Sequence, residues 1–160
     1  MTAKNITKIT TAQQSKTAGT ITTVNSYKQL VEVIENAKSS DYDEITISLE
    51  LGNYYVTQTI FWGNTKTSKK LTINGNNITL QGTRRLRFIE IEKDHIVNLN
   101  NITIQNYGNY NNGGAIYNNG TLTLTNSVLK NNYTYPHGGA IYNNGNVNIT
   151  HSTLNHNRDL

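Results

Sequence analysis

The fold is decided by Gly113-Gly114-Ala115-Ile116-Tyr117-Asn118-Asn119-Gly120, a stretch that the chain repeats. The same residue types return 25 residues later, as Gly138-Gly139-Ala140-Ile141-Tyr142-Asn143-Asn144-Gly145. The match continues past the octet, since Leu129 corresponds to Leu154, and a more divergent copy lies one period earlier around Val97. A fixed period of about 20–50 residues is the signature of a solenoid or a propeller.

The length of the repeat separates these two architectures. Twenty-five residues are too few for a four-stranded propeller blade of about 40 residues. They fit one coil of a parallel β-helix with three short strands, in which each coil adds about 4.8 Å along the axis. Equivalent residues should then stack, with Ile116 beneath Ile141 and Asn118 beside Asn143. The repeated Gly-Gly would let the chain turn where a Cβ atom would clash.

Strand alternation predicts which side chains of one copy face the core. The expected inward residues are Gly114, Ile116, Leu122, Leu124, Ser127 and Leu129. The expected outward residues are Ala115, Tyr117, Thr121, Thr123 and Thr125. The core would therefore be a stack of aliphatic side chains, and the outer surface would be rich in Thr, Tyr and Asn.

The front of the chain begins with a helix at about residues 27–37. Ser26 is a suitable N-cap, and Gln29 completes a capping box. A period of 2 follows, in which Ile45 and Leu51 are the first and last apolar residues of a half-buried strand. We expect further strand regions at 54–62, 71–73, 78–80, 85–91 and 95–99.

The sequence is thus all-β, a solenoid with an N-terminal capping helix. We divide it into a flexible or linker segment at 1–24, the cap and first coils at 25–95, and regular 25-residue coils at 96–160. The chain stops at Leu160 without a recognisable C-terminal cap. Because an uncapped solenoid end is an aggregation hazard, we expect a fragment or a truncated solenoid.

Composition excludes several functional classes. Only 15% of the 160 residues are charged, and Lys130 is the only formally charged residue between Ile96 and Asn157. A nucleic-acid interface needs clustered Lys and Arg, so we expect no nucleic-acid partner. There is no Cys, and no apolar run approaches the length of a membrane span. We expect no cofactor.

Two motifs resemble a known family. Gly-Gly-Ala-Ile at 113–116 and 138–141, followed by Leu-x-x-Asn at 129–132 and 154–157, is similar to the repeats of polymorphic outer-membrane proteins, which pair Gly-Gly-Ala-Ile with Phe-x-x-Asn. The longer phrase at 113–127 resembles the Asn/Thr-rich adhesin-like surface proteins of methanogenic archaea. The resemblance covers about residues 25–157. It implies a right-handed, single-stranded parallel β-helix of the pectin-lyase type, located at the cell surface or secreted.

Some β-helices of this type are enzymes, which need clustered carboxylates. The best cluster is Arg84, Arg85, Arg87, Glu90, Glu92, Asp94 and His95. Its paired Glu90 and Glu92 are the alternative site of a polysaccharide lyase or hydrolase, although charge runs usually form a solvated face. His137, His151 and His156 lack accompanying carboxylates or thiols, so we predict no metal site.

A better candidate site is an aromatic and amide surface, because such surfaces stack on sugar rings and hydrogen-bond hydroxyl groups. The alternative is a structural ladder that stabilises the stack. Among the Asn-x-Ser/Thr sequences, Asn5 and Asn132 are the candidate glycosylation acceptors, since both are expected in loops. The candidate surface consists of Tyr117, Asn118, Asn119, Tyr142, Asn143 and Asn144.

We therefore expect a non-enzymatic, adhesin-like surface segment that mediates attachment or serves as a stalk. Its partners would be cell-surface glycans or surface proteins. The alternative is a fragment of a carbohydrate-active β-helix enzyme.

Overall fold

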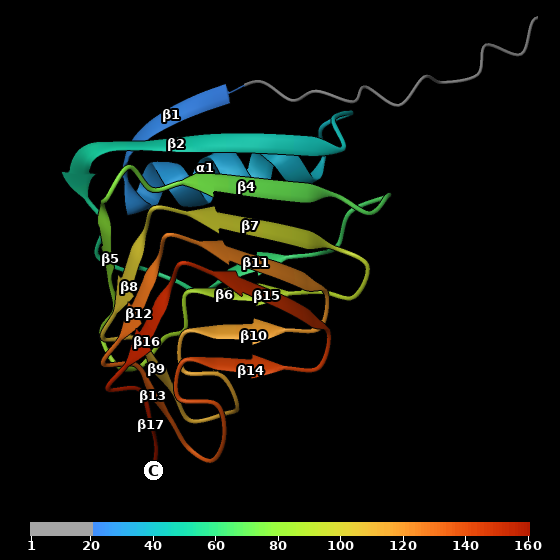
Figure 1. Cartoon of the computed structure of the whole chain (residues 1–160). Coiled ribbons are helices and arrows are strands. Elements are labelled where there is room, and N and C mark those ends of the chain that lie inside the picture. The colour runs from blue at the N-terminus through green and yellow to red at the C-terminus, as the bar shows by residue number, and fades with distance from the viewer. Residues whose placement is uncertain (1–20) are drawn as a thin grey trace, which may run out of the picture.

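The computed structural model describes residues 21–160, which form a parallel β-solenoid of about six turns with one helix near the N-terminal end (Figure 1). The expected fold class is confirmed. In chain order the elements are β1 (Ile21–Ser26), α1 (Tyr27–Lys38), β2 (Glu44–Asn53), β3 (Ile60–Trp62), β4 (Lys70–Asn74), β5 (Thr79–Gln81), β6 (Ile89–Ile91), β7 (Ile96–Asn100), β8 (Thr103–Gln105), β9 (Gly108–Asn109), β10 (Ile116–Asn118), β11 (Thr121–Thr125), β12 (Val128–Lys130), β13 (Tyr133–Thr134), β14 (Ile141–Asn143), β15 (Asn146–Thr150), β16 (Thr153–Asn155) and β17 (Arg158–Asp159).

The strands stack into four parallel sheets that run along the solenoid. The largest has the order β1-β2-β4-β7-β11-β15, and the others are β3-β6-β10-β14, β5-β8-β12-β16 and β9-β13-β17. The 25-residue register is confirmed, because Ile116 pairs with Ile141 and Asn118 with Asn143. A coil such as β10 to β13 has three main strands and a fourth of only two residues, which the repeat pattern did not reveal.

The helix begins where the sequence predicts. The Ser26 side chain accepts a hydrogen bond from the Gln29 amide at 3.3 Å, and the Gln29 side chain accepts one from the Asn25 amide at 2.9 Å. Ser26 is therefore the N-cap, as predicted, but the Gln29 side chain bonds the amide one residue before the N-cap and not that of Ser26 as in a capping box. The buried face of α1 consists of Tyr27, Leu30, Val31, Ile34 and Ala37.

Most residues face as alternation predicts, with two exceptions. Ala115 was expected outward, but it is fully buried. It lies just before β10, where the chain bends and strand alternation does not apply, and its carbonyl accepts hydrogen bonds from the Phe88 and Ile89 amides. Leu51 was expected inward, but it is 89% exposed, because β2 pairs with β4 only as far as Ser48.

The many asparagines have a conformational explanation at the corners of the coils. Positive backbone φ angles recur every 25 residues, and asparagine tolerates this left-handed region better than most residues. In the last coil a histidine occupies each of these corner positions, so two of the histidines have a structural role. The two columns are Asn101, Asn126 and His151 (51°, 49° and 48°), and Asn106, Asn131 and His156 (60°, 55° and 52°).

Glycine is required at the start of the repeated octet. Gly113 and Gly138 have φ angles of +83° and +80°, which L side chains rarely adopt. At the next position, a Cβ on Gly114 would overlap the carbonyl oxygen of Gly139 in the adjacent coil. The Gly-Gly pair therefore provides both a turn and a close approach between coils.

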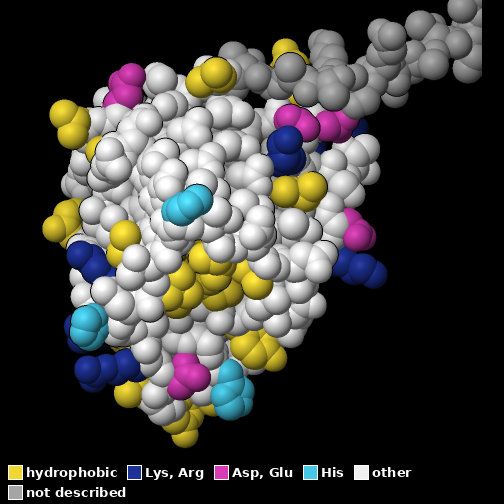
Figure 2. All heavy atoms as spheres, viewed as in Figure 1, with side chains coloured by type: hydrophobic (Ala, Val, Ile, Leu, Met, Phe, Trp, Pro, Cys, Tyr) yellow, Lys and Arg dark blue, Asp and Glu magenta, His cyan; other side chains and the backbone are white. Residues whose placement is uncertain are grey.

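The two ends of the solenoid differ. At the N-terminal end, α1 contacts β1, β2 and β3 and covers the core. At the other end, Val147, Ile149 and Leu154 occupy core positions of the repeat but are each 42% exposed. Figure 2 shows hydrophobic side chains gathered in the region where β14, β15 and β16 lie in Figure 1.

Candidate functional site

Four side chains from four coils form one column on the outer face of the sheet β3-β6-β10-β14. Phe61 pairs with Glu90, Glu90 with Tyr117, and Tyr117 with Tyr142. The residues that flank the column in β3, β6 and β10 are buried, so strand alternation directs the column outward. We call these four residues the outer column.

The two tyrosines of the outer column stack on each other. The ring centroids of Tyr117 and Tyr142 are 5.3 Å apart, and the ring planes differ by 21°. Aromatic pairs at this separation contribute roughly 0.5–1.5 kcal/mol beyond the area that they bury. Both rings remain partly exposed, so the pair is a rigid aromatic platform that a ligand can reach.

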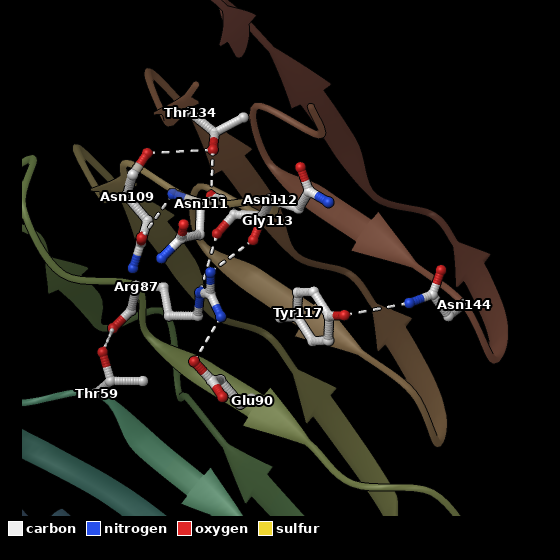
Figure 3. Close-up of polar contacts among 10 residues, drawn as sticks. All are labelled: Thr59, Arg87, Glu90, Asn109, Asn111, Asn112, Gly113, Tyr117, Thr134 and Asn144. Atoms are coloured by element: carbon white, nitrogen blue, oxygen red, sulfur yellow. Dashed lines mark hydrogen bonds and ion pairs between the residues drawn. The ribbon is translucent and has the colours of Figure 1, made fainter. Parts of the chain in front are cut away.

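Beneath this platform lies a buried arginine (Figure 3). The Arg87 guanidinium is 5.1 Å from the centroid of the Tyr117 ring and forms an ion pair with Glu90. It also donates hydrogen bonds to the carbonyls of Gly113, at 3.1 Å, and Asn112, at 2.6 Å. Burial lowers the pKa of Arg87, and the charge of Glu90 opposes this shift. Arg87 therefore ties the glycine turn, the carboxylate and the aromatic ring into one unit.

Exposed amides lie beside the tyrosines. The Asn144 side chain donates a hydrogen bond to the Tyr117 hydroxyl at 3.3 Å (Figure 3). It donates another to the Asn119 side chain at 3.0 Å. Asn119, Asn143 and Asn144 are exposed. Each amide group has more donors and acceptors than these contacts use, so the surface can hydrogen-bond a ligand.

Asn118 does not belong to this surface, which corrects our expectation. It is fully buried, because it occupies an inward position of β10. Its amide donates to the Asn143 side chain at 2.6 Å and to the Asn146 carbonyl at 2.9 Å, and its oxygen accepts from the Gly120 amide at 3.1 Å. These bonds make the burial of a polar group tolerable, so Asn118 has a structural role.

In the charged segment 84–95, the carboxylates of Glu90 and Glu92 bond to different partners. The Glu90 carboxylate is paired with Arg87, whereas the Glu92 carboxylate accepts a hydrogen bond from the Asn64 amide at 2.9 Å. His95 is buried. Each carboxylate therefore has its own structural partner.

The three histidines of the repeat region lie apart from acidic clusters. His151 and His156 occupy the corner columns, and His137 is exposed. Within residues 21–160, no group of three His, Cys, Asp or Glu side chains is arranged to hold a metal ion.

The two candidate glycosylation acceptors differ in where they lie. Asn5 lies outside the described residues. Asn132 is fully buried, because its side chain bonds inward to the Ile104 carbonyl and to Asn157, so our expectation of a loop acceptor is corrected. The exposed asparagines of the remaining acceptor sequences are Asn77, Asn101, Asn119 and Asn148.

Sequence reasoning found the tyrosine pair but missed half of the outer column. Phe61, Glu90 and Tyr117 are separated by 29 and 27 residues rather than 25, because the loops of the first coils are longer. The outward position in each Ile-x-Ile or Ile-x-Trp strand is the signal that could have identified them. Arg87 had no comparable signal, since its role depends on a turn 25 residues away.

The site defines the chain only as a parallel β-solenoid with an aromatic and amide surface. Comparisons with protein families, with curated proteins and with solved structures find no match. Among the described residues, no helix has the length and apolar character needed to span a membrane.

Proposed function

We propose that this β-solenoid is a non-enzymatic, adhesin-like segment at the cell surface or outside the cell, where it mediates attachment or serves as a stalk. Its binding surface is the Tyr117–Tyr142 stack with the neighbouring Asn119 and Asn144. Its ligand is a neutral sugar unit of a surface glycan. The observation on which this proposal rests is the stacked, partly exposed pair of aromatic rings bordered by exposed amides.

The chemistry of the surface supports a sugar ligand. A pyranose ring has an apolar face that packs on an aromatic ring, and hydroxyl groups at its edge that need hydrogen-bond partners. The Tyr142 ring supplies the first through the face turned away from Tyr117, because Tyr142 and Arg87 both lie against the Tyr117 ring. Asn119 and Asn144 supply the second. Both tyrosines are fixed before binding by stacking and by the sheet, so little side-chain entropy is lost on binding.

A repeating solenoid also suits a stalk. Each coil contacts mainly its neighbours, so the structure extends in one direction and equivalent side chains recur along it. A glycan chain is likewise a linear repeat, so a solenoid with equivalent side chains in successive coils suits it.

A carbohydrate-active enzyme is the second candidate, and the observation that favours it is Glu90 in the same column as the tyrosines. In this reading Glu90 would be the acid or base. Its ion pair with Arg87 disfavours the role, because the carboxylate already has a structural partner and is not free to contact a substrate.

The proposal is tested by binding of neutral oligosaccharides on a glycan array, followed by calorimetry with the tightest of them. Replacing both Tyr117 and Tyr142 by Ala should weaken binding at least about fivefold, since stacking contributes on the order of 1 kcal/mol or more. Tyr142→Ala alone leaves the Arg87 contact intact and should produce part of the loss. Tyr55→Ala removes a 62% exposed tyrosine outside the column and should have no effect.

Two results would contradict the proposal. One is unchanged binding in the double variant, which would leave the tyrosines with a purely structural role. The other is cleavage of any bound oligosaccharide that is lost in Glu90→Gln, which would favour the enzyme.

A further inference from the structure

A second concave site lies on the part of the surface formed by the two-residue strands. It is a cavity of about 440 Å³ whose walls include Arg84, Tyr133, His156, Arg158 and Leu160. This volume lies in the range of ligand pockets, about 300–1,000 Å³. None of these residues belongs to the outer column, so the cavity is a separate site.

The fold brings these residues together from distant parts of the chain. Tyr133 and Arg158 are register partners in the sheet β9-β13-β17. Arg84 comes from 49 residues earlier, and the Tyr133 hydroxyl donates a 2.5 Å hydrogen bond to its carbonyl. The Arg84 guanidinium is 5.8 Å from the centroid of the Tyr133 ring. Tyr133 therefore holds both the backbone and the charged group of Arg84.

The charged side chains that line the cavity are all basic. Its walls contain two arginines and a histidine but no acidic side chain. The ion pairs found within residues 21–160 involve neither Arg84 nor Arg158. Asp159 follows Arg158 in β17, but its carboxylate accepts a hydrogen bond from the Gly139 amide. Leu160, the last residue of the chain, adds one α-carboxylate to the wall. Two arginines without an ion-pair partner among the described residues therefore line the cavity and outnumber this one carboxylate, whereas the buried Arg87 is paired with Glu90.

The size and lining of the cavity restrict the class of ligand further. Guanidinium groups bind the planar or tetrahedral oxygens of carboxylate and sulfate with paired hydrogen bonds. The Tyr133 ring and Leu160 add apolar wall, and the volume greatly exceeds that of a bare anion. The cavity thus suits a ring-sized molecule with one anionic group. A nucleic acid is disfavoured, because binding its backbone needs a track of cations, and Lys130 is the only formally charged residue between Ile96 and Asn157.

We infer that this cavity binds an acidic sugar, through its carboxylate or sulfate group, at a site distinct from the neutral-sugar surface of the tyrosine pair. Arg84 and Arg158 bind the anionic oxygens, and Tyr133 positions Arg84 and forms one wall. The solenoid would then have two separate sugar sites, one for a neutral sugar unit and one for an acidic sugar unit.

The test is calorimetry with four probes: a galacturonate trisaccharide, a sulfated galactose trisaccharide, a neutral galactose trisaccharide and a short single-stranded oligonucleotide. We expect one of the two acidic saccharides to bind most tightly, and their ratio distinguishes carboxylate from sulfate. The neutral trisaccharide should bind at least about tenfold more weakly at this site, since charge-assisted hydrogen bonds are lost.

The substitutions that test the site are chosen to suit its backbone conformation. Arg84 has a φ of +64°, so Arg84→Asn removes the charge while placing a residue that tolerates this conformation. Arg84→Asn and Arg158→Gln should each weaken acidic saccharide binding at least about tenfold. Arg85→Gln removes the same charge from an exposed neighbour that does not line the cavity, and it should change affinity less than about twofold.

Three outcomes would overturn the inference. They are no binding of either acidic saccharide, an equal loss in Arg85→Gln and the two cavity variants, or tighter binding of the oligonucleotide than of both saccharides. Replacing both Tyr117 and Tyr142 by Ala should leave the acidic saccharide bound. The inference and the proposed function can therefore fail independently.

Discussion

The two ends of the solenoid bury the same kind of side chain to different degrees. At the N-terminal end, Leu30 and Ile34 of α1 are fully buried over the core. At the other end, Val147, Ile149 and Leu154 have the same apolar character, yet each is 42% exposed. The difference is that a helix covers one end, whereas no described element covers the other.

This comparison shows that burial in a stack comes from the neighbouring coils and not from the residue itself. Leu129 and Leu154 are the same residue at the same position of the repeat, and they are partners in the register of β12 and β16. Leu129 is fully buried because a coil lies on each side, whereas Leu154 has a coil on one side only. The core of each coil is therefore completed by the coils next to it.

The largest effect should come from this matched leucine pair. Leu129→Ala should lower the free energy of unfolding by about 3–4 kcal/mol, because it leaves a cavity between two coils. Leu154→Ala should cost only about 1 kcal/mol, because water already reaches that side chain. Urea denaturation of both variants gives the two free energies.

Equal losses in the two variants would contradict the comparison, since they would indicate that the last coil is covered in solution. A useful control is Leu51→Ala in the first coils. Leu51 is 89% exposed, so its truncation should change stability by less than about 0.5 kcal/mol.

The repeat made most of this architecture predictable from the sequence. A 25-residue match fixes which residues stack, so the pairs Ile116–Ile141 and Leu129–Leu154 followed without a structure. The capping helix followed from Ser26 and its apolar period. These features are local or periodic, and a single sequence contains both kinds of information.

The failures share a different cause. Ala115, Asn118 and Asn132 were all assigned to the surface, and all three are fully buried. Their burial depends on hydrogen bonds to an adjacent coil or on a bend just outside a strand, which polarity and alternation do not report. The cavity beside Arg84 was missed for the same reason, since it joins Arg84 to residues two and three coils along the stack.

The second effect concerns the buried asparagine ladder. The Asn132 oxygen accepts a hydrogen bond from the Tyr107 amide at 2.9 Å, and its amide donates to the Ile104 carbonyl at 3.1 Å. Asn132→Ala removes both bonds and takes the acceptor from the Tyr107 amide, so it should cost about 2–3 kcal/mol. Asn157→Ala changes the equivalent residue in the less covered coil and should cost about 1 kcal/mol, because water can replace its bonds.

Thermal unfolding of the two variants measures this difference. Asn132→Asp provides a second check, because it retains the acceptor for the Tyr107 amide but buries a charge and should be at least as damaging as the alanine. A stable, fully folded Asn132→Ala would show that the ladder contributes little.

The smallest effect at pH 7 should come from Tyr27 and Tyr107, two of the buried phenols. Burial raises the pKa of Tyr27 and of Tyr107 well above the usual value of about 10. Below pH of about 10, both phenols are protonated in the folded and the unfolded chain, so stability is unaffected. Above it, the unfolded chain loses these protons while the folded chain keeps them, so the free energy of unfolding falls by about 1.4 kcal/mol per pH unit for each phenol.

Tyr107→Phe separates this pH effect from packing. The Tyr27 hydroxyl donates a 2.8 Å hydrogen bond to the Gln58 carbonyl, whereas the Tyr107 hydroxyl is buried without a partner among residues 21–160. Removing the Tyr107 hydroxyl should therefore raise stability at pH 7 by up to about 1 kcal/mol and halve the decline that the two phenols cause above pH of about 10. Denaturation of Tyr107→Phe and of the unmodified chain at pH 7 and pH 11 measures this decline. If both proteins lost the same free energy of unfolding between the two pH values, the buried phenols would not be its cause.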